Sequence, residues 1–273
     1  MTEVQKYSGA GNSFIIMDNR NSDVSDYYTI VIDLMEKFPG NDGVIFLETS
    51  GKADFRMNYF NRDGTGDALC GNGLRCTVKY ISDNLFSERN KLNIETVSQI
   101  YECEIISGNE ISVKFPPPVI IKTNFRLKVH FQEWWELLKC SYVDIGSPHI
   151  VVFTDDIQKP KVNSIEEVNI SEWGRNIRMH KDLMPEGANV NFAEITGSGQ
   201  LAIRSFERGV EAETLACGTG SISAALIYYI TREQCKPVRL LTRSGKYLKV
   251  DFEICEKKLK SITLSGEAEK IFT

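Results

Sequence analysis

Two stretches of this chain place a cysteine directly before a glycine-containing turn. They are DALCGNGLRC at residues 67–76 and LACGTGSIS at residues 215–223. In both, Cys-Gly-x-Gly leads into a helix-like pattern, which puts Cys70 and Cys217 at or near helix N-termini. Backbone N–H groups and the positive dipole end at such positions lower a thiol's pKa from about 8.5 to roughly 3.5–7.5, and they also bind carboxylates. The pattern predicts two reactive thiols, each beside an anion site.

The first stretch also holds Cys76, which raises the alternatives of a metal half-site or a redox pair. Five residues separate Cys70 from Cys76. Zinc sites use C-x2–4-C and thioredoxin-like pairs use C-x-x-C, and no histidine cluster follows here. We therefore expect no metal, and we place Cys76 in a helix core.

The two stretches belong to a longer internal repeat. Cys70 and Cys217 are 147 residues apart, and the T-x-S-x-x-Y pattern at 96–101 recurs 146 residues later at 242–247. Between the copies lies FPPPVII at 115–121, whose three prolines continue neither a helix nor a central strand. This indicates two similar domains joined by a linker.

Strand-like alternation dominates the chain, and helix-like periodicity is clearest at 29–38, 74–86 and 222–233. Strands and helices do not follow a regular βαβ rhythm, which favours an α+β fold. We expect two similar domains related by pseudo-two-fold symmetry. Each should be a curved, mainly antiparallel sheet or barrel around a central helix, with the active site in the cleft between them.

The linker sets the expected domain boundaries. The first repeat domain should comprise residues 1–116, joined by the C-terminal strand at 261–273, and the second should comprise residues 117–260.

Two thiols facing each other across such a cleft suit inversion at a carbon next to a carboxylate. One thiolate takes the α-proton, and the opposite thiol returns a proton to the other face. Helix N–H groups stabilise the negative charge that develops on the carboxylate. We expect no cofactor, because neither pyridoxal phosphate nor a metal is needed in principle.

These residues resemble the diaminopimelate epimerase family, cofactor-independent isomerases of the lysine and peptidoglycan pathway. The resemblance covers nearly the whole chain and is carried by five blocks: KYSGAGNSFIIMD, FNRDGTGDALCGNGLRC, GSPHIVVF, EGANVNFAEI and ERGVEAETLACGTG.

The resemblance implies a role for each matching position. From the LL to the meso isomer, Cys217 would abstract the α-proton and Cys70 would donate one, with His149 and Glu207 supporting thiol ionisation. Four residues would hold the carboxylate at the reacting centre: Gly71, Asn72, Gly218 and Thr219. The other substrate-binding positions would be Asn12, Asn61, Ser147, Asn189, Glu207 and Arg208. The guanidinium fork of Arg208 suits a carboxylate.

The chain departs from the family pattern at three places. Ser147 stands where Asn is usual, and its hydroxyl reaches less far than an amide. The loop at 209–214 has one extra residue and no second glycine. Gly43 stands where some members place a substrate-contacting Gln. We therefore expect the chemistry to be kept and selection for diaminopimelate to be less strict, with glutamate as a second substrate to test.

Two other functions compete with diaminopimelate epimerisation. One is a related cofactor-independent racemase for glutamate or proline-type substrates. The other is a non-enzymatic amino-acid-binding or thiol-sensing protein.

Composition limits the partners. The net charge is −5 without a Lys/Arg cluster, which argues against nucleic acid. No run of 18 apolar residues indicates a membrane span, and the start lacks an apolar signal core. Seven cysteines are an odd count typical of reduced thiols. We expect a cytoplasmic protein with a small amino acid as substrate, and the resemblance is compatible with a homodimer.

Overall fold

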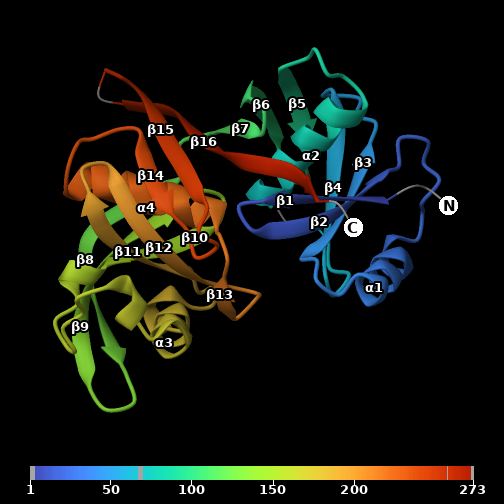
Figure 1. The fold of residues 1–273 in the computed structure, drawn as a ribbon. Helices are drawn as coiled ribbons and strands as arrows, with labels where there is room; N and C mark the ends of the chain where they lie inside the picture. The colour runs from blue at the N-terminus through green and yellow to red at the C-terminus, as the bar shows by residue number, and fades with distance from the viewer. Residues whose placement is uncertain (1–3, 67–69, 257, 272–273) are drawn as a thin grey trace. The chain divides into compact units, whose positions relative to one another are not determined.

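The computed structural model describes residues 4–66, 70–256 and 258–271. The chain divides into two compact units. Unit 1 comprises Met1–Phe115 with Ser265–Thr273, and unit 2 comprises Pro116–Leu264. The strands and helices of each unit are coloured along the chain in Figure 1.

Unit 1 is a closed sheet around one helix. Its strands are β1 (Val4–Gly9), β2 (Asn12–Asp18), β3 (Gly43–Glu48), β4 (Phe55–Asn61), β5 (Lys91–Glu95), β6 (Ile100–Ser107), β7 (Glu110–Phe115) and the C-terminal part of β16 (Lys258–Ile271). They neighbour one another in chain order from β1 to β7, and β16 pairs with both β7 and β1, which closes the barrel. The helices are α1 (Tyr27–Lys37) and α2 (Gly71–Asn84).

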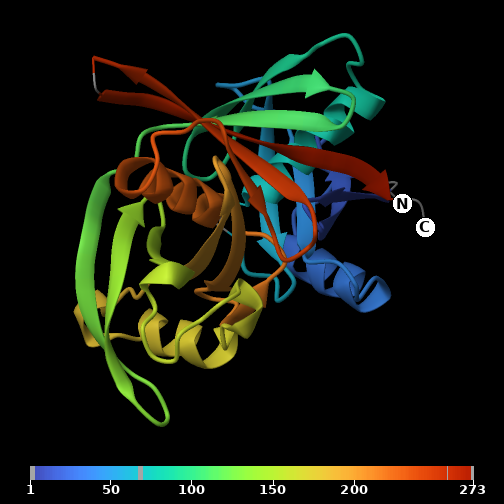
Figure 2. The ribbon, with the colours of Figure 1, turned by 60° about the vertical axis from the view of Figure 1, so that its left-hand side comes forward.

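Helix α2 is the central helix of unit 1. It packs against β1, β2, β3, β4, β6 and β7, and most of its residues are buried. Figures 1 and 2 both show it among these strands. Gly73 packs close to β3: a Cβ there would lie 3.1 Å from Ile45 Cδ1, a contact that a small shift of the end of that side chain can relieve. Cys76 is fully buried, which confirms its expected place in the helix core.

Unit 2 repeats this plan around α4 (Gly218–Thr231). Its strands are β8 (Ile120–His130), β9 (Trp135–Asp144), β10 (Pro148–Phe153), β11 (Asn189–Gly197), β12 (Gln200–Glu207), β13 (Ala212–Thr214), β14 (Val238–Leu241) and β15 (Tyr247–Cys255). The order is β8-β9-β10-β11-β12-β14-β15, and β13 pairs with β12. The smaller helical segments are η1 (Thr154–Asp156), η2 (Ile165–Glu167), η3 (Ile170–Gly174), α3 (Arg175–Arg178) and η4 (Lys181–Leu183).

The strand pairings show the repeat. From β1 to β6 they alternate antiparallel, parallel, antiparallel, parallel, antiparallel. The series β9, β10, β11, β12, β14, β15 alternates in the same way. The α+β class with two similar domains is thus confirmed.

The T-x-S-x-x-Y repeat forms a similar turn in both units, which Thr96 closes at Gln99 O and Thr242 closes at Lys246 O. The hydroxyls of Thr96 and Ser98 lie 3.2 Å apart before β6, and those of Thr242 and Ser244 lie 2.9 Å apart before β15. In each case the threonine hydroxyl also donates to a backbone carbonyl, at 2.9 Å. This part of the repeat is therefore structural.

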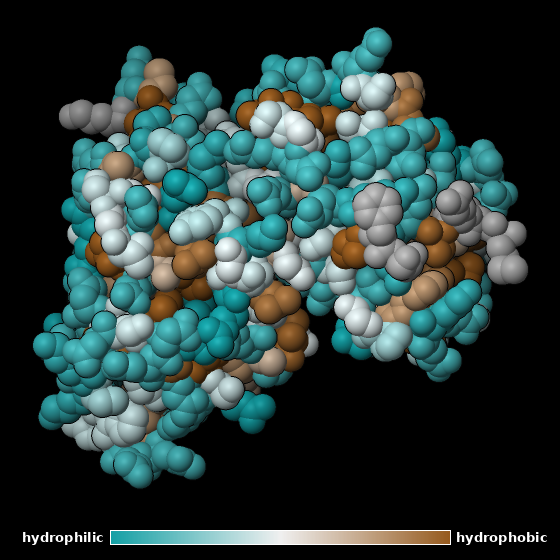
Figure 3. Space-filling model, in the orientation of Figure 1, coloured by the Kyte–Doolittle hydropathy of each residue, from teal (hydrophilic) through white to brown (hydrophobic). Residues whose placement is uncertain are grey.

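Polar and charged residues cover most of the face drawn in Figure 3, with smaller apolar areas between them. Within the described ranges, none of the helices is both long and apolar enough to cross a membrane.

Candidate active site

Cys70 and Cys217 cap the central helices of their units with the same geometry. The Sγ atom of Cys70 accepts a hydrogen bond from Gly73 N at 3.3 Å, and that of Cys217 accepts one from Gly220 N at 3.3 Å. Both residues are extended, with φ and ψ of −117° and 105° for the first and −111° and 112° for the second. Each sulfur therefore lies against the unpaired N–H groups of a helix that has 14 residues.

On the unit 1 side, Asn12 and Asn72 are brought together. The Nδ2 of Asn72 donates to the Oδ1 of Asn12 at 2.7 Å, which ties the start of β2 to the start of α2. Gly71 follows Cys70 as the first residue of the helix, and its nearest neighbour for an added Cβ is Phe115, at 3.9 Å. The carboxylate anchor predicted at residues 71 and 72 thus lies beside the side-chain amide of Asn12, which the hydrogen bond from Asn72 orients.

Asn61 ends β4 in the same unit. Its amide donates to Thr65 Oγ1 at 3.0 Å and accepts from the Tyr59 hydroxyl at 2.9 Å. Its strand partner is Gly43, where an added Cβ would lie 2.3 Å from Phe60 O. A side chain at position 43 would therefore require the backbone of β4 to shift.

On the unit 2 side, Cys217 lies with Thr219 and Glu207. Its Sγ is 3.6 Å from Thr219 Oγ1, and it shares a side-chain hydrogen bond with Glu207. The carboxylate of Glu207 accepts a second hydrogen bond from Thr214 Oγ1 at 2.6 Å. Gly218 begins the helix, with Leu264 Cδ2 3.0 Å from where a Cβ would be.

Burial raises the pKa of the Cys217 thiol well above its usual value, and the charge of Glu207 raises it further. The helix-end hydrogen bond from Gly220 acts in the opposite direction and is outweighed. The lowering of pKa predicted from helix position is therefore wrong for Cys217. The residue is buried, with 9% of its surface exposed, and desolvation of the thiolate outweighs the hydrogen bonds that favour it.

His149 is fully buried on β10, and its pKa is lowered to about 3 by desolvation and then by the charge of Arg208. Its ring nitrogens contact Ser147 Oγ at 3.0 Å through Nε2 and Asn191 Nδ2 at 3.1 Å through Nδ1. The imidazole is neutral, and its tautomer is set by these neighbours.

Asn191 fixes that tautomer. Its Nδ2 also donates to the carbonyl of Ile150 at 3.1 Å, and its Oδ1 accepts from Ser205 Oγ at 2.9 Å, so the amide cannot be reversed. His149 Nδ1 must therefore accept, and Nε2–H donates to Ser147. Sequence reasoning missed Asn191. It is fully buried on β11, two residues after Asn189, and a second asparagine on one face of a strand was the available signal.

Asn189 and Arg208 meet where β11 and β12 run antiparallel. The Oδ1 of Asn189 accepts from the backbone N–H of Arg208 at 2.8 Å, and its Nδ2 donates to Pro148 O at 3.2 Å. The guanidinium of Arg208 donates to the carbonyl of Glu186 at 3.2 Å. Asn189 thus holds the strand ends that carry His149 and Arg208.

The extra residue in the 209–214 loop is accommodated by Glu211. This residue has a φ of 57°, and its carboxylate accepts from Gly209 N at 3.1 Å and from Arg178 Nε at 2.9 Å. The loop is therefore anchored to α3. Next to it, Glu213 forms a two-point ion pair with Arg204, at 2.7 and 2.8 Å.

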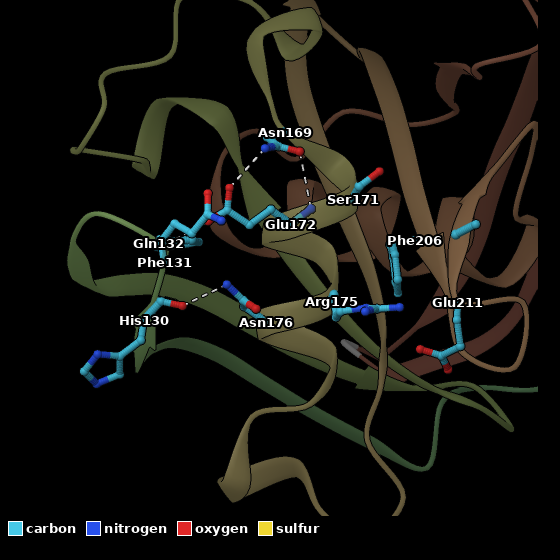
Figure 4. A pocket seen from close by; sticks show the side chains of 11 residues that line it. His130, Phe131, Gln132, Asn169, Ser171, Glu172, Arg175, Asn176, Phe206 and Glu211 are labelled. Carbon is cyan, nitrogen blue, oxygen red and sulfur yellow. Dashed lines mark hydrogen bonds between the residues drawn. The ribbon is translucent and has the colours of Figure 1, made fainter.

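A cavity of about 700 Å³ in unit 2 is lined in part by Glu211 and Ala212 of this loop. Figure 4 shows Arg175 extending towards Phe206 and Glu211, and the cavity wall continues through Asn169 and Glu172. Among the described residues that line it, none is a predicted site residue. Nor do residues 4–66, 70–256 and 258–271 contain three or more His, Cys, Asp or Glu side chains grouped to hold a metal ion.

The chain matches the family model described as diaminopimelate epimerase over residues 4–121 and 141–271. It is 38% identical over 271 residues to the diaminopimelate epimerase of Chlorobaculum tepidum, covering 97% of both chains. It is 31% identical to that of Aquifex aeolicus, covering 99% of this chain and 96% of the relative.

Solved structures share the fold at low identity. A PhzF-family phenazine biosynthesis protein of Bacillus anthracis superposes with a TM-score of 0.70 at 19% identity, covering 99% of this chain and 97% of that one. A hydroxyproline epimerase of Agrobacterium vitis gives 0.69 at 14% identity, with 98% and 88% covered. The matched blocks, the paired cysteine caps and the extent of these similarities lead to one conclusion: the chain belongs to the diaminopimelate epimerase family and is an isomerase.

Proposed function

We propose that this protein interconverts LL- and meso-diaminopimelate by two-base proton transfer, with Cys217 and Cys70 as the proton-carrying groups. The observation that supports this most is the matched pair of caps. Two cysteines from the two copies of the repeat accept the same backbone hydrogen bond at the same distance, 3.3 Å. The product isomer would serve lysine and peptidoglycan synthesis, as the resemblance implies.

The reaction needs one thiolate and one thiol at opposite faces of the α-carbon. In the LL-to-meso direction, the Cys217 thiolate takes the α-proton, and the C–H electron pair moves towards the substrate carboxylate. The Cys70 thiol then gives its proton to the other face of the carbon. Cys217 ends as a thiol and Cys70 as a thiolate, so the protein is set for the reverse direction. Backbone N–H groups at the helix starts stabilise the charge on the carboxylate.

Glu207 has a definite task in this scheme. Its carboxylate accepts the hydrogen bond of the Cys217 thiol, so it is placed to receive the proton when that thiol ionises. The same negative charge opposes thiolate formation before substrate arrives. An ammonium group of the substrate beside Glu207 would remove that opposition. Binding of substrate and activation of the thiol are then coupled.

The distal end of the substrate would be held by side chains that the fold already orients. Asn189 fixes the backbone of Arg208, and His149 Nε2–H donates to Ser147, so the serine proton is directed to a further acceptor. A hydroxyl reaches less far than the usual asparagine amide. We propose slower turnover of glutamate as a consequence.

The test is α-proton exchange in D2O, followed by NMR, with LL-diaminopimelate, meso-diaminopimelate and L-glutamate. We expect exchange and isomer interconversion with both diaminopimelate isomers, and slow exchange with glutamate. The Cys255→Ser variant, which changes an exposed thiol, should match the parent protein. Absence of exchange with diaminopimelate in the parent would reject the proposed function. Exchange confined to diaminopimelate would reject relaxed specificity alone.

A further inference from the structure

Arg75 is a buried arginine next to the Cys70 cap. It lies on the first turns of α2, its exposed fraction is 0%, and it is among the largest fully buried side chains. Its Nη2 donates to Asn72 Oδ1 at 2.6 Å, and its Nη1 donates to Gly71 O at 3.4 Å. Its Nε is buried without an acceptor among the described residues.

The charge of Arg75 has no carboxylate partner among the described residues. The ionisable groups near enough to stabilise the charge of Arg75 when they are deprotonated are the thiols of Cys70 and Cys76. Desolvation lowers the pKa of Arg75, yet a guanidinium keeps its proton in proteins. Arg204 in unit 2 shows the usual alternative, because its guanidinium is paired at two points with Glu213. A buried cation without a paired anion is costly to a fold, so the question is which group around Arg75 could compensate its charge.

Of the two thiols, Cys76 stays neutral, because burial raises its pKa far above its usual range. The strands packed against α2 bring Tyr7, Tyr101 and Cys103, and burial raises the pKa of each of these as well. In the proposed function, Cys70 carries a negative charge in one half of the cycle. Cys70 is therefore the described neighbour whose thiolate can balance the positive charge of Arg75.

Arg75 also determines which way two predicted substrate-binding amides face. By donating to Asn72 Oδ1, it turns the Asn72 Nδ2 towards Asn12 Oδ1, at 2.7 Å. The side-chain oxygen of Asn12 thus accepts the hydrogen bond from Asn72. Its NH2 group has no acceptor among the described residues. A substrate carboxylate would fit that donor.

The two copies of the repeat carry different residues at the positions equivalent to Arg75 and Glu207. The position equivalent to Arg75 in unit 2, 147 residues later, is Ile222, which is fully buried. The position equivalent to Glu207 in unit 1 is Asn61, 146 residues earlier. Unit 1 therefore holds a buried cation where unit 2 has an apolar residue, and unit 2 holds a carboxylate where unit 1 has an amide.

We propose, building on the two-thiol function, that Arg75 is a positioning residue that favours the thiolate of Cys70 and orients the Asn72–Asn12 pair for the substrate carboxylate. The buried charge stabilises the anion electrostatically, and the hydrogen bonds to Asn72 fix the amides. Cys70 is then the more readily ionised thiol of the resting protein, and Cys217 is the protonated one.

The test measures how the rate of Cys70 alkylation by iodoacetamide depends on pH, read by peptide mass mapping in the absence of substrate. Arg75→Met, which keeps length and removes charge, should move the midpoint of the profile up by at least about one pH unit, or about tenfold in rate at pH 7. Arg75→Lys should keep most of the parent profile. The matched control is Lys79→Met, which removes a cation that pairs with Asp83 on the same helix.

A second variant, Asn72→Asp, tests the same proposal if Arg75→Met does not fold. Asn72→Asp leaves the arginine in place and gives it a carboxylate at a position already 2.6 Å from Nη2, so it should shift the midpoint upwards in the same direction. In epimerisation assays, Arg75→Met should lose more rate in the meso-to-LL direction, which starts from the Cys70 thiolate. Unchanged midpoints in folded Arg75→Met or in Asn72→Asp would overturn the proposal. Because alkylation needs no substrate, this failure is distinct from an inactive parent protein.

Discussion

At the scale of single residues, the site is governed by which polar groups are buried and what they touch. His149 is neutral because burial, and then the positive charge of Arg208, lowers its pKa. Its proton lies on Nε2 because Asn191 donates to Nδ1. The GSPHIVVF stretch indicated His149 as a site residue, but the sequence could not indicate whether the imidazole is charged. Burial and neighbours from other strands decide that, and the same holds for the raised pKa of Cys217.

The buried imidazole makes stability depend on pH. Its pKa is about 3 in the folded protein and about 6.5 when unfolded, so between these values the unfolded chain binds more protons. Stability should therefore fall as the pH falls from 6.5 towards 3, by up to about 1.4 kcal/mol per unit from this group. Urea unfolding of His149→Gln at pH 7, 6, 5 and 4 should show a shallower fall than the parent. Ser147→Ala keeps the imidazole and should retain the parent slope, whereas parallel curves for His149→Gln and the parent would refute the account.

At the scale of elements, the two central helices are positioned by glycines near their starts. The sequence predicted these helices three or four residues late, at 74–86 and 222–233, because Gly-Asn-Gly and Gly-Thr-Gly have low helix propensity. Tertiary packing overrides that propensity. A Cβ at Gly220 would lie 2.2 Å from Asn191 Oδ1, and one at Gly73 would lie 3.1 Å from Ile45 Cδ1.

These contacts predict unequal effects of alanine at equivalent positions. Asn191 is held by three hydrogen bonds and cannot move aside, whereas the end of the Ile45 side chain can. Gly220→Ala should lower stability by about 1–3 kcal/mol, and Gly73→Ala by less than about 1 kcal/mol. At about 3 °C per kcal/mol, calorimetry should show a drop in Tm of about 3–9 °C for the first and under about 3 °C for the second. Gly51→Ala, with nothing within 4 Å of its Cβ, is the control, and equal drops at 73 and 220 would contradict the packing argument.

At the scale of the whole molecule, a duplicated backbone plan carries two different chemical halves. The duplication could be predicted from the sequence, since matching patterns at offsets of 146 and 147 residues require no structure. The difference between the halves could not. Arg75 resembles any helical arginine in the sequence. Only its burial, without a carboxylate partner among the described residues and at the position that Ile222 takes in unit 2, makes it stand out. Asn191 and the Glu211 anchor were missed for the same reason, because their partners lie on other elements.

The central claim is that each thiol handles the proton of one stereoisomer. The most direct measurement is solvent deuterium exchange without inversion in two single variants. Cys70→Ser retains the Cys217 thiol and should exchange the α-proton of LL-diaminopimelate while losing interconversion by about 10³-fold. Cys217→Ser should instead exchange the proton at the D-centre of meso-diaminopimelate, with the same loss of interconversion. Interconversion near the parent rate in either variant, or the same isomer exchanged by both, would contradict the account.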